Sequence, residues 1–182
     1  MQTHRDLLDR WRNAMNLVGP GAIDVHFDDC TRALAGIQPQ GHWVDLGSGA
    51  GFPGLVLAAL WPKLTIELVD SRKKRCVFLE QVLAAADVPA DRVRVRRMRV
   101  EDLEGPYDGL VARAFAPPDR VVGLALQLLR EGGLCVLFLQ DGAPIPVREG
   151  LEVFHVEQRR PYAALVGGGS WMMRHGAPLI LP

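Results

Sequence analysis

A glycine-rich turn between two strand-like runs constrains the fold of this chain more than any other feature. Residues 43–46 form the first run, residues 47–54 read Gly-Ser-Gly-Ala-Gly-Phe-Pro-Gly, and the second run ends at Asp70. A strand, a glycine-rich turn, a helix and a second strand closed by an acid make up a βαβ unit, which forms a nucleotide-like pocket at the carboxyl ends of its strands. The pattern therefore predicts an α/β fold with such a pocket.

The carboxylate of Asp45, placed just before the first glycine, narrows the class of ligand. A dinucleotide fold usually keeps this position apolar, because the pyrophosphate beyond it needs backbone N–H groups and a helix N-terminus. A carboxylate suits a ligand that carries an ammonium or a sulfonium, so S-adenosylmethionine is the leading candidate. We expect Asp45, Gly47 and Gly49 to face its amino-acid tail and Asp70 to accept hydrogen bonds from its ribose hydroxyls.

Two alternatives for the same turn stay open on the sequence alone. Residues 49–54 satisfy the dinucleotide fingerprint G-x-G-x-x-G, which keeps an NAD-binding oxidoreductase as an alternative. That match begins late, after the turn's first glycine, and the chain leaves no room for a second, substrate-holding domain. A turn that only connects a strand to a helix is the other alternative. The position of Asp45 before the first glycine and the late start of the G-x-G-x-x-G match favour S-adenosylmethionine over a dinucleotide as the ligand.

Length and composition indicate one globular domain. The 182 residues carry 21 basic and 21 acidic side chains, so net charge gives no whole-molecule argument for binding nucleic acid. No apolar run approaches the roughly 20 residues that span a bilayer, and the first residues contain no apolar signal segment. The three cysteines form no C-x-x-C pair. We therefore expect a cytoplasmic protein with reduced thiols, no metal site and no membrane association.

Helix and strand patterns divide the chain into a helical segment, residues 1–40, and a cofactor-binding core, residues 41–182, within a single methyltransferase domain. Strands are expected over residues 43–46, 64–69, 92–98, 107–112 and 134–139, with helices over residues 53–60 and 72–86 and from a cap at Asp119 onwards. Residues 151–157 and 170–175 read as two more strands joined as a hairpin. The alternation predicts a mostly parallel sheet covered on both faces.

Polar residues follow two strands at the predicted pocket. Glu101, next to Val100, follows the third strand, where a backbone amide and a carboxylate can read an adenine edge; a loop acid in solvent gives the same pattern. Arg113 ends the fourth strand, and a buried strand seldom ends on arginine without a partner. We expect Arg113 to contact cofactor or substrate, with a structural ion pair as the alternative. The basic residues 72–75 read as a solvated helix face.

The segment 115–119 bears on the methyl acceptor. It reads Phe-Ala-Pro-Pro-Asp and lacks both flanks of the Asp/Asn-Pro-Pro-aromatic motif of enzymes that methylate exocyclic amines. None of the cysteines follows a proline, as the nucleophile of pyrimidine carbon-5 methylation usually does. The acceptors that remain have a free lone pair and no proton to lose, such as a purine ring nitrogen. For these, catalysis consists mainly of proximity and alignment.

A series of motifs in matching order resembles one family, the bacterial 16S ribosomal RNA guanine-N7 methyltransferases, also called glucose-inhibited division protein B. The similarity begins at Trp11 and runs almost to the carboxyl end. The motifs that carry it are Trp11-Arg12-Asn13-Ala14-Met15-Asn16-Leu17, His26-Phe27-Asp28-Asp29, residues 45–54 with their Pro-Gly ending, Leu68-Val69-Asp70-Ser71, Lys74-Arg75, Phe78-Leu79, Arg99-Val100-Glu101 and Arg113-Ala114-Phe115-Ala116.

The resemblance implies a Rossmann-like, class I methyltransferase that uses S-adenosylmethionine. Its mostly parallel sheet would have seven strands, the last two forming an antiparallel hairpin. The implied partner is 16S ribosomal RNA, free or within the small-subunit particle, and we expect the protein to act as a monomer. The matched motifs imply cofactor contacts at Gly47, Phe52, Val100, Glu101 and Arg113, and a substrate side that includes Asn16, His26 and Asp29. Arg113 is the best candidate for a catalytic role.

One difference from the family pattern leaves an alternative function open. The family usually carries Lys-Gly just after its fifth strand, near the acceptor base, whereas residues 139–142 here read Leu-Gln-Asp-Gly. A relative that binds the cofactor or RNA with weak turnover is therefore the alternative to a methyltransferase acting on N7 of guanine.

Overall fold

A sheet built from short apolar runs forms the centre of the computed structural model, which describes residues 1–19, 21–140, 151–156 and 168–175. Its parallel part contains β1 (His42–Leu46), β2 (Thr65–Val69), β3 (Val93–Arg96), β4 (Tyr107–Arg113) and β5 (Leu129–Gln140), in the order β3-β2-β1-β4-β5. Leu46 pairs with Val69 on β2 and with Ala112 on β4, so neighbouring strands end at one edge of the sheet. The predicted parallel core is confirmed.

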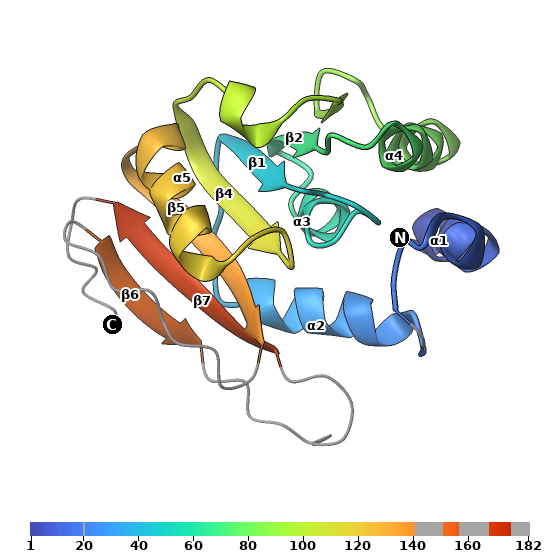
Figure 1. Ribbon diagram of the computed structural model, residues 1–182, viewed down its shortest axis with the longest axis horizontal. Helices are drawn as coiled ribbons and strands as arrows, with labels where there is room; N and C mark the ends of the chain where they lie inside the picture. Colours follow the sequence, from blue (N-terminus) through green and yellow to red (C-terminus); the bar gives the residue numbers. More distant parts are fainter. Residues whose placement is uncertain (20, 141–150, 157–167, 176–182) are drawn as a thin grey trace.

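Two further strands extend the sheet beyond β5 (Figure 1). β7 (Gly168–His175) pairs antiparallel with β5, and β6 (Leu151–Val156) pairs antiparallel with β7. The complete order is β3-β2-β1-β4-β5-β7-β6. β7 therefore lies between β5 and β6, and the direction of the chain alternates at this side of the sheet.

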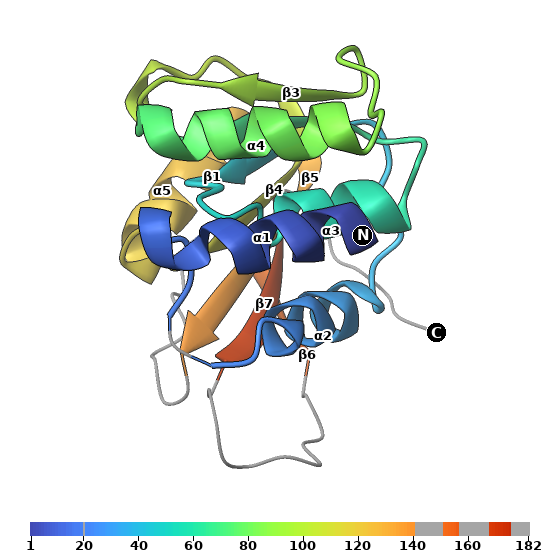
Figure 2. The ribbon, with the colours of Figure 1, turned by 90° about the vertical axis from the view of Figure 1, so that its right-hand side faces the viewer.

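Helices cover both faces of the sheet, as its alternating side chains require. One face carries α1 (Gln2–Met15), α2 (Asp24–Leu34), α3 (Gly54–Leu60) and α4 (Lys73–Ala85), which lie in front of the sheet in Figure 2. The other face carries the 3-10 turn η1 (Val100–Asp102) and α5 (Pro118–Leu128) (Figure 1). Trp43 of β1 packs among residues of α1 to α4, whereas Val44 and Leu46 pack among residues of α5.

The two amino-terminal helices pack onto the core through apolar stripes. Leu8 of α1 and Phe27 of α2 are 0% and 1% exposed, and both belong to the core cluster that contains residues of α3 and α4. Among the described residues, no helix combines the length and the apolar character needed to cross a bilayer.

Some element boundaries differ from the predicted ones. Pro117, and not Asp119, is the N-cap of α5, so the predicted cap at Asp119 is wrong and this acid lies in the first turn, near the positive helix end. Pro53 precedes α3 rather than belonging to it. β5 begins at Leu129, earlier than expected, because Leu129 already pairs with Tyr107 of β4.

Candidate active site

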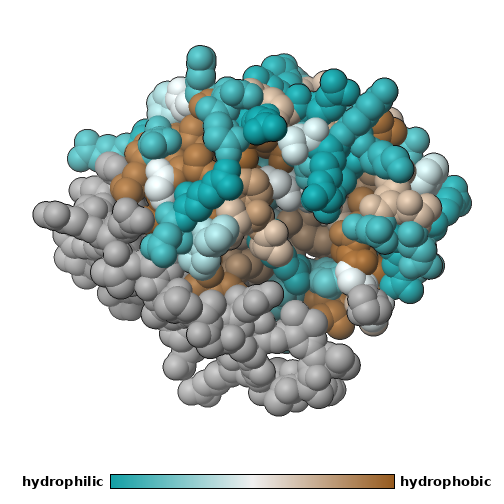
Figure 3. Space-filling model, in the orientation of Figure 1, coloured by the Kyte–Doolittle hydropathy of each residue, from teal (hydrophilic) through white to brown (hydrophobic). Residues whose placement is uncertain are grey.

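Two cavities lie next to each other at the carboxyl ends of the parallel strands. Each has a volume of about 660 Å³, within the range of roughly 300–1,000 Å³ typical of ligand pockets. Gly47, Arg75, Ala114 and Phe115 line both of them. In the orientation of Figure 1, the space-filling view shows a hollow with apolar residues at its floor and hydrophilic side chains around it (Figure 3). A ligand that extends past the shared residues can occupy both cavities.

Gly47 makes the turn between the two cavities, and its backbone admits no larger residue. Its φ is +69°, and a Cβ atom built on it would lie 2.5 Å from Cδ2 of Phe115. The next residue is anchored, because Ser48 donates its N–H to the carbonyl oxygen of Val69 at 2.9 Å. The turn thus joins the ends of β1 and β2 to the segment after β4, in the pocket wall where the sequence predicted it.

Asp45 lies beneath this turn and does not reach either cavity. The residue is 0% exposed, and its Oδ2 accepts a hydrogen bond from the Gly54 N–H, at the start of α3, at 3.1 Å. Burial raises the pKa of Asp45 to about 7. The side chain projects from β1 towards α3 and supports the turn from below, whereas the contact between Asp45 and the ligand stays a prediction.

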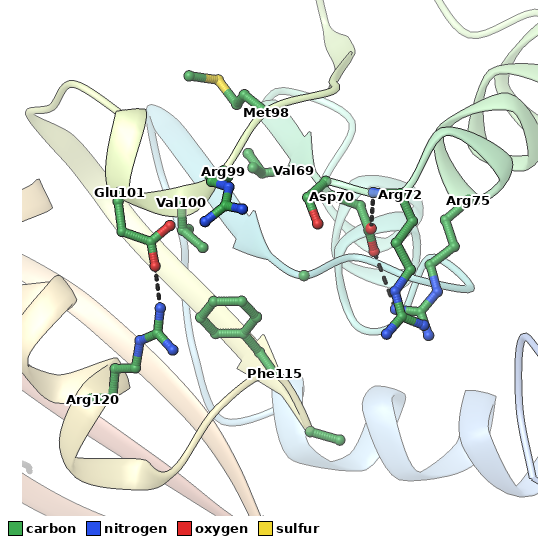
Figure 4. Close-up of a pocket in the computed structure, with 13 residues that line it drawn as sticks. Val69, Asp70, Arg72, Arg75, Met98, Arg99, Val100, Glu101, Phe115 and Arg120 are labelled. Atoms are coloured by element: carbon green, nitrogen blue, oxygen red, sulfur yellow. Dashed lines mark hydrogen bonds and ion pairs between the residues drawn. The ribbon is translucent and has the colours of Figure 1, made fainter.

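Asp70, the residue after β2, lies in the wall of the first cavity (Figure 4). Its Oδ1 accepts a hydrogen bond from the Arg72 N–H at 2.8 Å, and its Oδ2 accepts from the Gly49 N–H at 3.1 Å and from Arg75 Nη1 at 3.3 Å. A carboxylate offers about four acceptor positions, so one stays available to a ligand. Asp70 ties the predicted Gly49 to α4, and Arg75, interpreted from the sequence as part of a solvated face, lies inside the site.

Apolar side chains and one ion pair form the opposite wall of the first cavity. Met98, Val100 and Phe115 line it, and Glu101 accepts a hydrogen bond from Arg120 of α5 (Figure 4). Both charged side chains are about half exposed, at 49% and 55%, so the pair lies at the mouth of the cavity. The structure places Val100 and Glu101 in the predicted pocket. Sequence reasoning missed Arg120, because its pairing with η1 exists only in the folded chain.

A cluster around Arg113 forms part of the second cavity. Nη2 of Arg113 lies 3.0 Å from Oδ2 of Asp29 and 3.1 Å from Nδ1 of His26, and Nη1 lies 3.5 Å from Sγ of Cys30. Burial raises the pKa of Asp29, an effect that Arg113 partly offsets, and burial together with Arg113 lowers the pKa of His26. Arg113 therefore makes the ion pair that was the alternative and also lines the cavity, where its contact with cofactor or substrate stays a prediction.

Phe52 and Asn16 occupy different environments, although the resemblance implied a site role for each. Phe52 lines the second cavity, where its ring centroid lies 5.5 Å from that of His26. Asn16 is exposed and belongs to neither cavity. It ends α1 with φ 49° and ψ 50°, a left-handed conformation that asparagine tolerates. The structure thus assigns Asn16 to a helix end, while its neighbours Leu17 and Val18 line the second cavity.

His4 of α1 is a buried residue at the glycine turn that sequence reasoning missed. Its Nε2 lies 2.7 Å from the carbonyl oxygen of Ala50, and its ring centroid lies 5.0 Å from that of Phe27 and 5.1 Å from that of Phe52. Burial lowers the pKa of His4 to about 4, so the neutral ring donates its N–H to Ala50 at pH 7. One signal was present in the sequence: His4 lies four residues before Leu8, on the same helix face.

Sequence comparison places the chain among ribosomal RNA methyltransferases. It matches the family described as rRNA small subunit methyltransferase G over residues 1–162. The relative of that name from Paramagnetospirillum magneticum is 37% identical over 79% of this chain and 71% of its own length. The one from Novosphingobium aromaticivorans is 39% identical over 95% of this chain and 80% of its own length.

Solved structures of similar fold agree with this placement at the level of the fold. A putative methyltransferase from Escherichia coli, yhhF, has a TM-score of 0.64 at 15% identity and covers 88% of this chain and 92% of its own. The P. horikoshii protein TYW2, solved in complex with MeSAdo, has a TM-score of 0.60 at 17% identity. The match covers 81% of this chain and 61% of the TYW2 chain. Both support a Rossmann-like methyltransferase fold. The family match and the identities with its members show that the chain belongs to the rRNA small subunit methyltransferase G family.

Proposed function

We propose that this chain transfers a methyl group from S-adenosylmethionine to N7 of a guanine in 16S ribosomal RNA. Family membership makes it an S-adenosylmethionine-dependent ribosomal RNA methyltransferase and removes the NAD-binding oxidoreductase alternative. The assignment of guanine N7 as the acceptor is supported by the pair of adjoining cavities. The first has Asp70 and apolar walls, and the second contains Arg113.

The residues around the first cavity suit the adenosine part of the cofactor. Asp70 retains an acceptor position for a ribose hydroxyl, and Met98 and Val100 offer apolar surface to the adenine ring. Glu101 lies at the mouth, where a carboxylate can accept a hydrogen bond from an exocyclic amine. Gly47 has no side chain to block the way into the second cavity, where Gly49 and Phe52 would face the amino-acid tail. When bound, the cofactor supplies an electrophilic methyl group on a positively charged sulfur.

The second cavity suits a guanine acceptor. N7 of guanine has a lone pair and carries no proton, so its methylation needs no general base. Arg113 is held in place by Asp29 and His26, and its planar fork can donate a hydrogen bond to the O6 carbonyl of the base. Phe52 and Phe138 provide apolar walls. In this proposal the residues of the cavity act by orienting the base, which is the main contribution available for such an acceptor.

The proposal extends to the organisation of the chain. Residues 1–182 would form one methyltransferase domain, in which the helical segment 1–40 packs on the core 41–182, and we expect it to act as a monomer in the cytoplasm. Burial of Leu8 and Phe27 in the same cluster as residues of α3 and α4 supports a single unit. The cysteines are free and buried, which fits a reducing compartment.

The proposal is tested by incubating the purified protein with S-adenosylmethionine labelled on its methyl group and with unmethylated 16S RNA, in parallel with small-subunit particles. We expect label in 7-methylguanine after digestion of the RNA, and the more active of the two substrates identifies the natural form. Label on adenine or cytosine would contradict the assigned acceptor.

A weakly active relative that binds cofactor or RNA remains the second candidate. The observation behind it is the absence of the family's lysine after β5, at Asp141 and Gly142, which lie outside the described residues. Binding of S-adenosylhomocysteine without methyl transfer to either RNA substrate would favour this candidate.

A further inference from the structure

Arg75 lies where the two cavities meet, and the proposed reaction gives it no role. We propose that Arg75 binds the carboxylate of the cofactor's amino-acid tail and makes the protein selective for ligands that carry this group. The inference rests on the proposed function, in that the tail is taken to pass from the first cavity into the second. It names the residue that would recognise the end of that tail.

Arg75 reaches from α4 to the glycine turn. Its Nη1 lies 3.3 Å from Oδ2 of Asp70, and a Cβ atom built on Gly49 would lie 3.7 Å from the same nitrogen. Figure 4 shows the side chain extending from α4 towards Asp70. Because Arg75 and Gly47 line both cavities, a ligand that passes Gly47 meets this guanidinium.

The guanidinium of Arg75 has donors available for a ligand. A guanidinium carries five N–H donors, and within the described part of the chain its hydrogen-bond partner is Asp70. The 3.3 Å contact is longer than the roughly 2.7–2.9 Å of a strong charge-assisted hydrogen bond. The side chain is 27% exposed, so it is accessible from the cavities. A ligand carboxylate can therefore accept two N–H groups from it in the bidentate arrangement that arginine favours.

The neighbouring arginines are less suited to this task. Arg113 is 16% exposed, and its two terminal nitrogens already contact Asp29, His26 and Cys30. Arg72 lines the first cavity and does not line the second. Among the described residues, Arg75 is thus the arginine that lines both cavities, and its hydrogen bond to Asp70 leaves further N–H donors for a ligand.

Calorimetric titration without RNA tests the assignment. The ligands are S-adenosylmethionine and its decarboxylated form, which lacks only the carboxylate. The proteins are wild type, Arg75→Met and the matched control Lys74→Met, since Lys74 is exposed on the same helix and lines neither cavity. We expect the wild type to bind S-adenosylmethionine about 10- to 100-fold more tightly than the decarboxylated form, as is typical for a lost hydrogen-bonded charge. Arg75→Met should bind the two ligands with nearly equal affinity, and Lys74→Met should keep the wild-type preference.

Two results would overturn the assignment. One is a wild type that does not distinguish the two ligands. The other is an Arg75→Met protein whose affinity falls by the same factor for both ligands. Arg75 would then act only by holding Asp70 in position for the ribose. Arg75→Gln, which retains a hydrogen-bond donor for Asp70, supplies the same comparison if Arg75→Met fails to fold. Because no RNA is present, a failure to methylate guanine would refute the proposed acceptor and leave this binding result intact.

Discussion

Replacing Arg113 with lysine keeps the positive charge and removes the planar fork, so it tests whether geometry at this position matters for methyl transfer. Nη2 of Arg113 lies 3.0 Å from Asp29 and 3.1 Å from His26. A lysine ammonium is a single point donor and cannot reproduce the arrangement. We expect a folded Arg113→Lys protein that transfers methyl at least ~10-fold more slowly, which corresponds to about 1.4 kcal/mol of lost transition-state stabilisation.

Arg113→Met separates the contribution to stability from the contribution to activity. The side chains of Asp29 and Arg113 are 10% and 16% exposed, so removing the cation leaves a nearly buried carboxylate unpaired, which typically costs about 3–5 kcal/mol. Burial already raises the pKa of Asp29, and the variant loses the opposing effect of Arg113. A folded-state pKa above the unfolded value favours folding at low pH, so the destabilisation should shrink as the pH falls and Asp29 takes up a proton.

Urea unfolding at neutral and at acidic pH measures the effect on stability, and single-turnover methyl transfer measures the effect on activity. Arg130→Lys is the matched control, because Arg130 is 61% exposed and pairs with Asp108 near the opposite end of β4. We expect this control to change stability by no more than about 0.5 kcal/mol and activity not at all. Full activity of Arg113→Lys would show that the guanidinium is only a structural ion-pair partner. A destabilisation of Arg113→Met that grows at low pH would refute the role given to Asp29.

Three further substitutions test the glycine turn and its supports. Gly47→Ala should weaken S-adenosylhomocysteine binding at least ~10-fold, because the new Cβ would lie 2.5 Å from the Phe115 ring; Gly123→Ala, with no atom within 4 Å, is the control, and unchanged affinity would contradict the tight turn. Wild type should lose stability relative to His4→Gln as pH falls from 6.5 to about 4, because the unfolded chain binds a proton that buried His4 does not. Wild type should lose stability relative to Asp45→Asn as pH rises from 3.8 to about 7, because the folded state disfavours ionised Asp45. Urea unfolding across pH measures both, and parallel stability curves would refute either assignment.

The local sequence pattern was sufficient to predict the part of the site that a single continuous segment, residues 43–70, contributes. The run ending at residue 46, the turn at Gly47 and the acid at Asp70 are fixed by one βαβ unit, so their meeting in one pocket follows from sequence spacing. The alternation of side chains along the strand also indicates on which face of the sheet Asp45 lies. In a strand, side chains alternate between the two faces, and Asp45 shares the face of Trp43, which α1 to α4 cover.

Contacts between distant elements could not be predicted in this way. The pair of Glu101 and Arg120 joins η1 to α5, and Arg113 meets Asp29 across the interface between β4 and α2. No periodicity links such residues, because each contact depends on how two elements pack. Arg75 shows the same limit: its basic neighbours suggested a solvated face, whereas the packing of α4 brings this one side chain to Asp70.

The supports of the glycine turn show most clearly why sequence is insufficient there. His4 holds the carbonyl oxygen of Ala50 and Asp45 holds the N–H of Gly54, so two buried titratable groups fix two backbone groups of the turn. Their pH effects oppose each other: His4 disfavours the folded state as pH falls below 6.5, and Asp45 disfavours it as pH rises towards about 7. No pH suits both groups fully, and between about pH 4 and pH 6.5 the two effects on the free energy of unfolding largely cancel. Both bind backbone groups, which nearly every residue carries, and only the packing of α1 and α3 selects the two that these side chains meet.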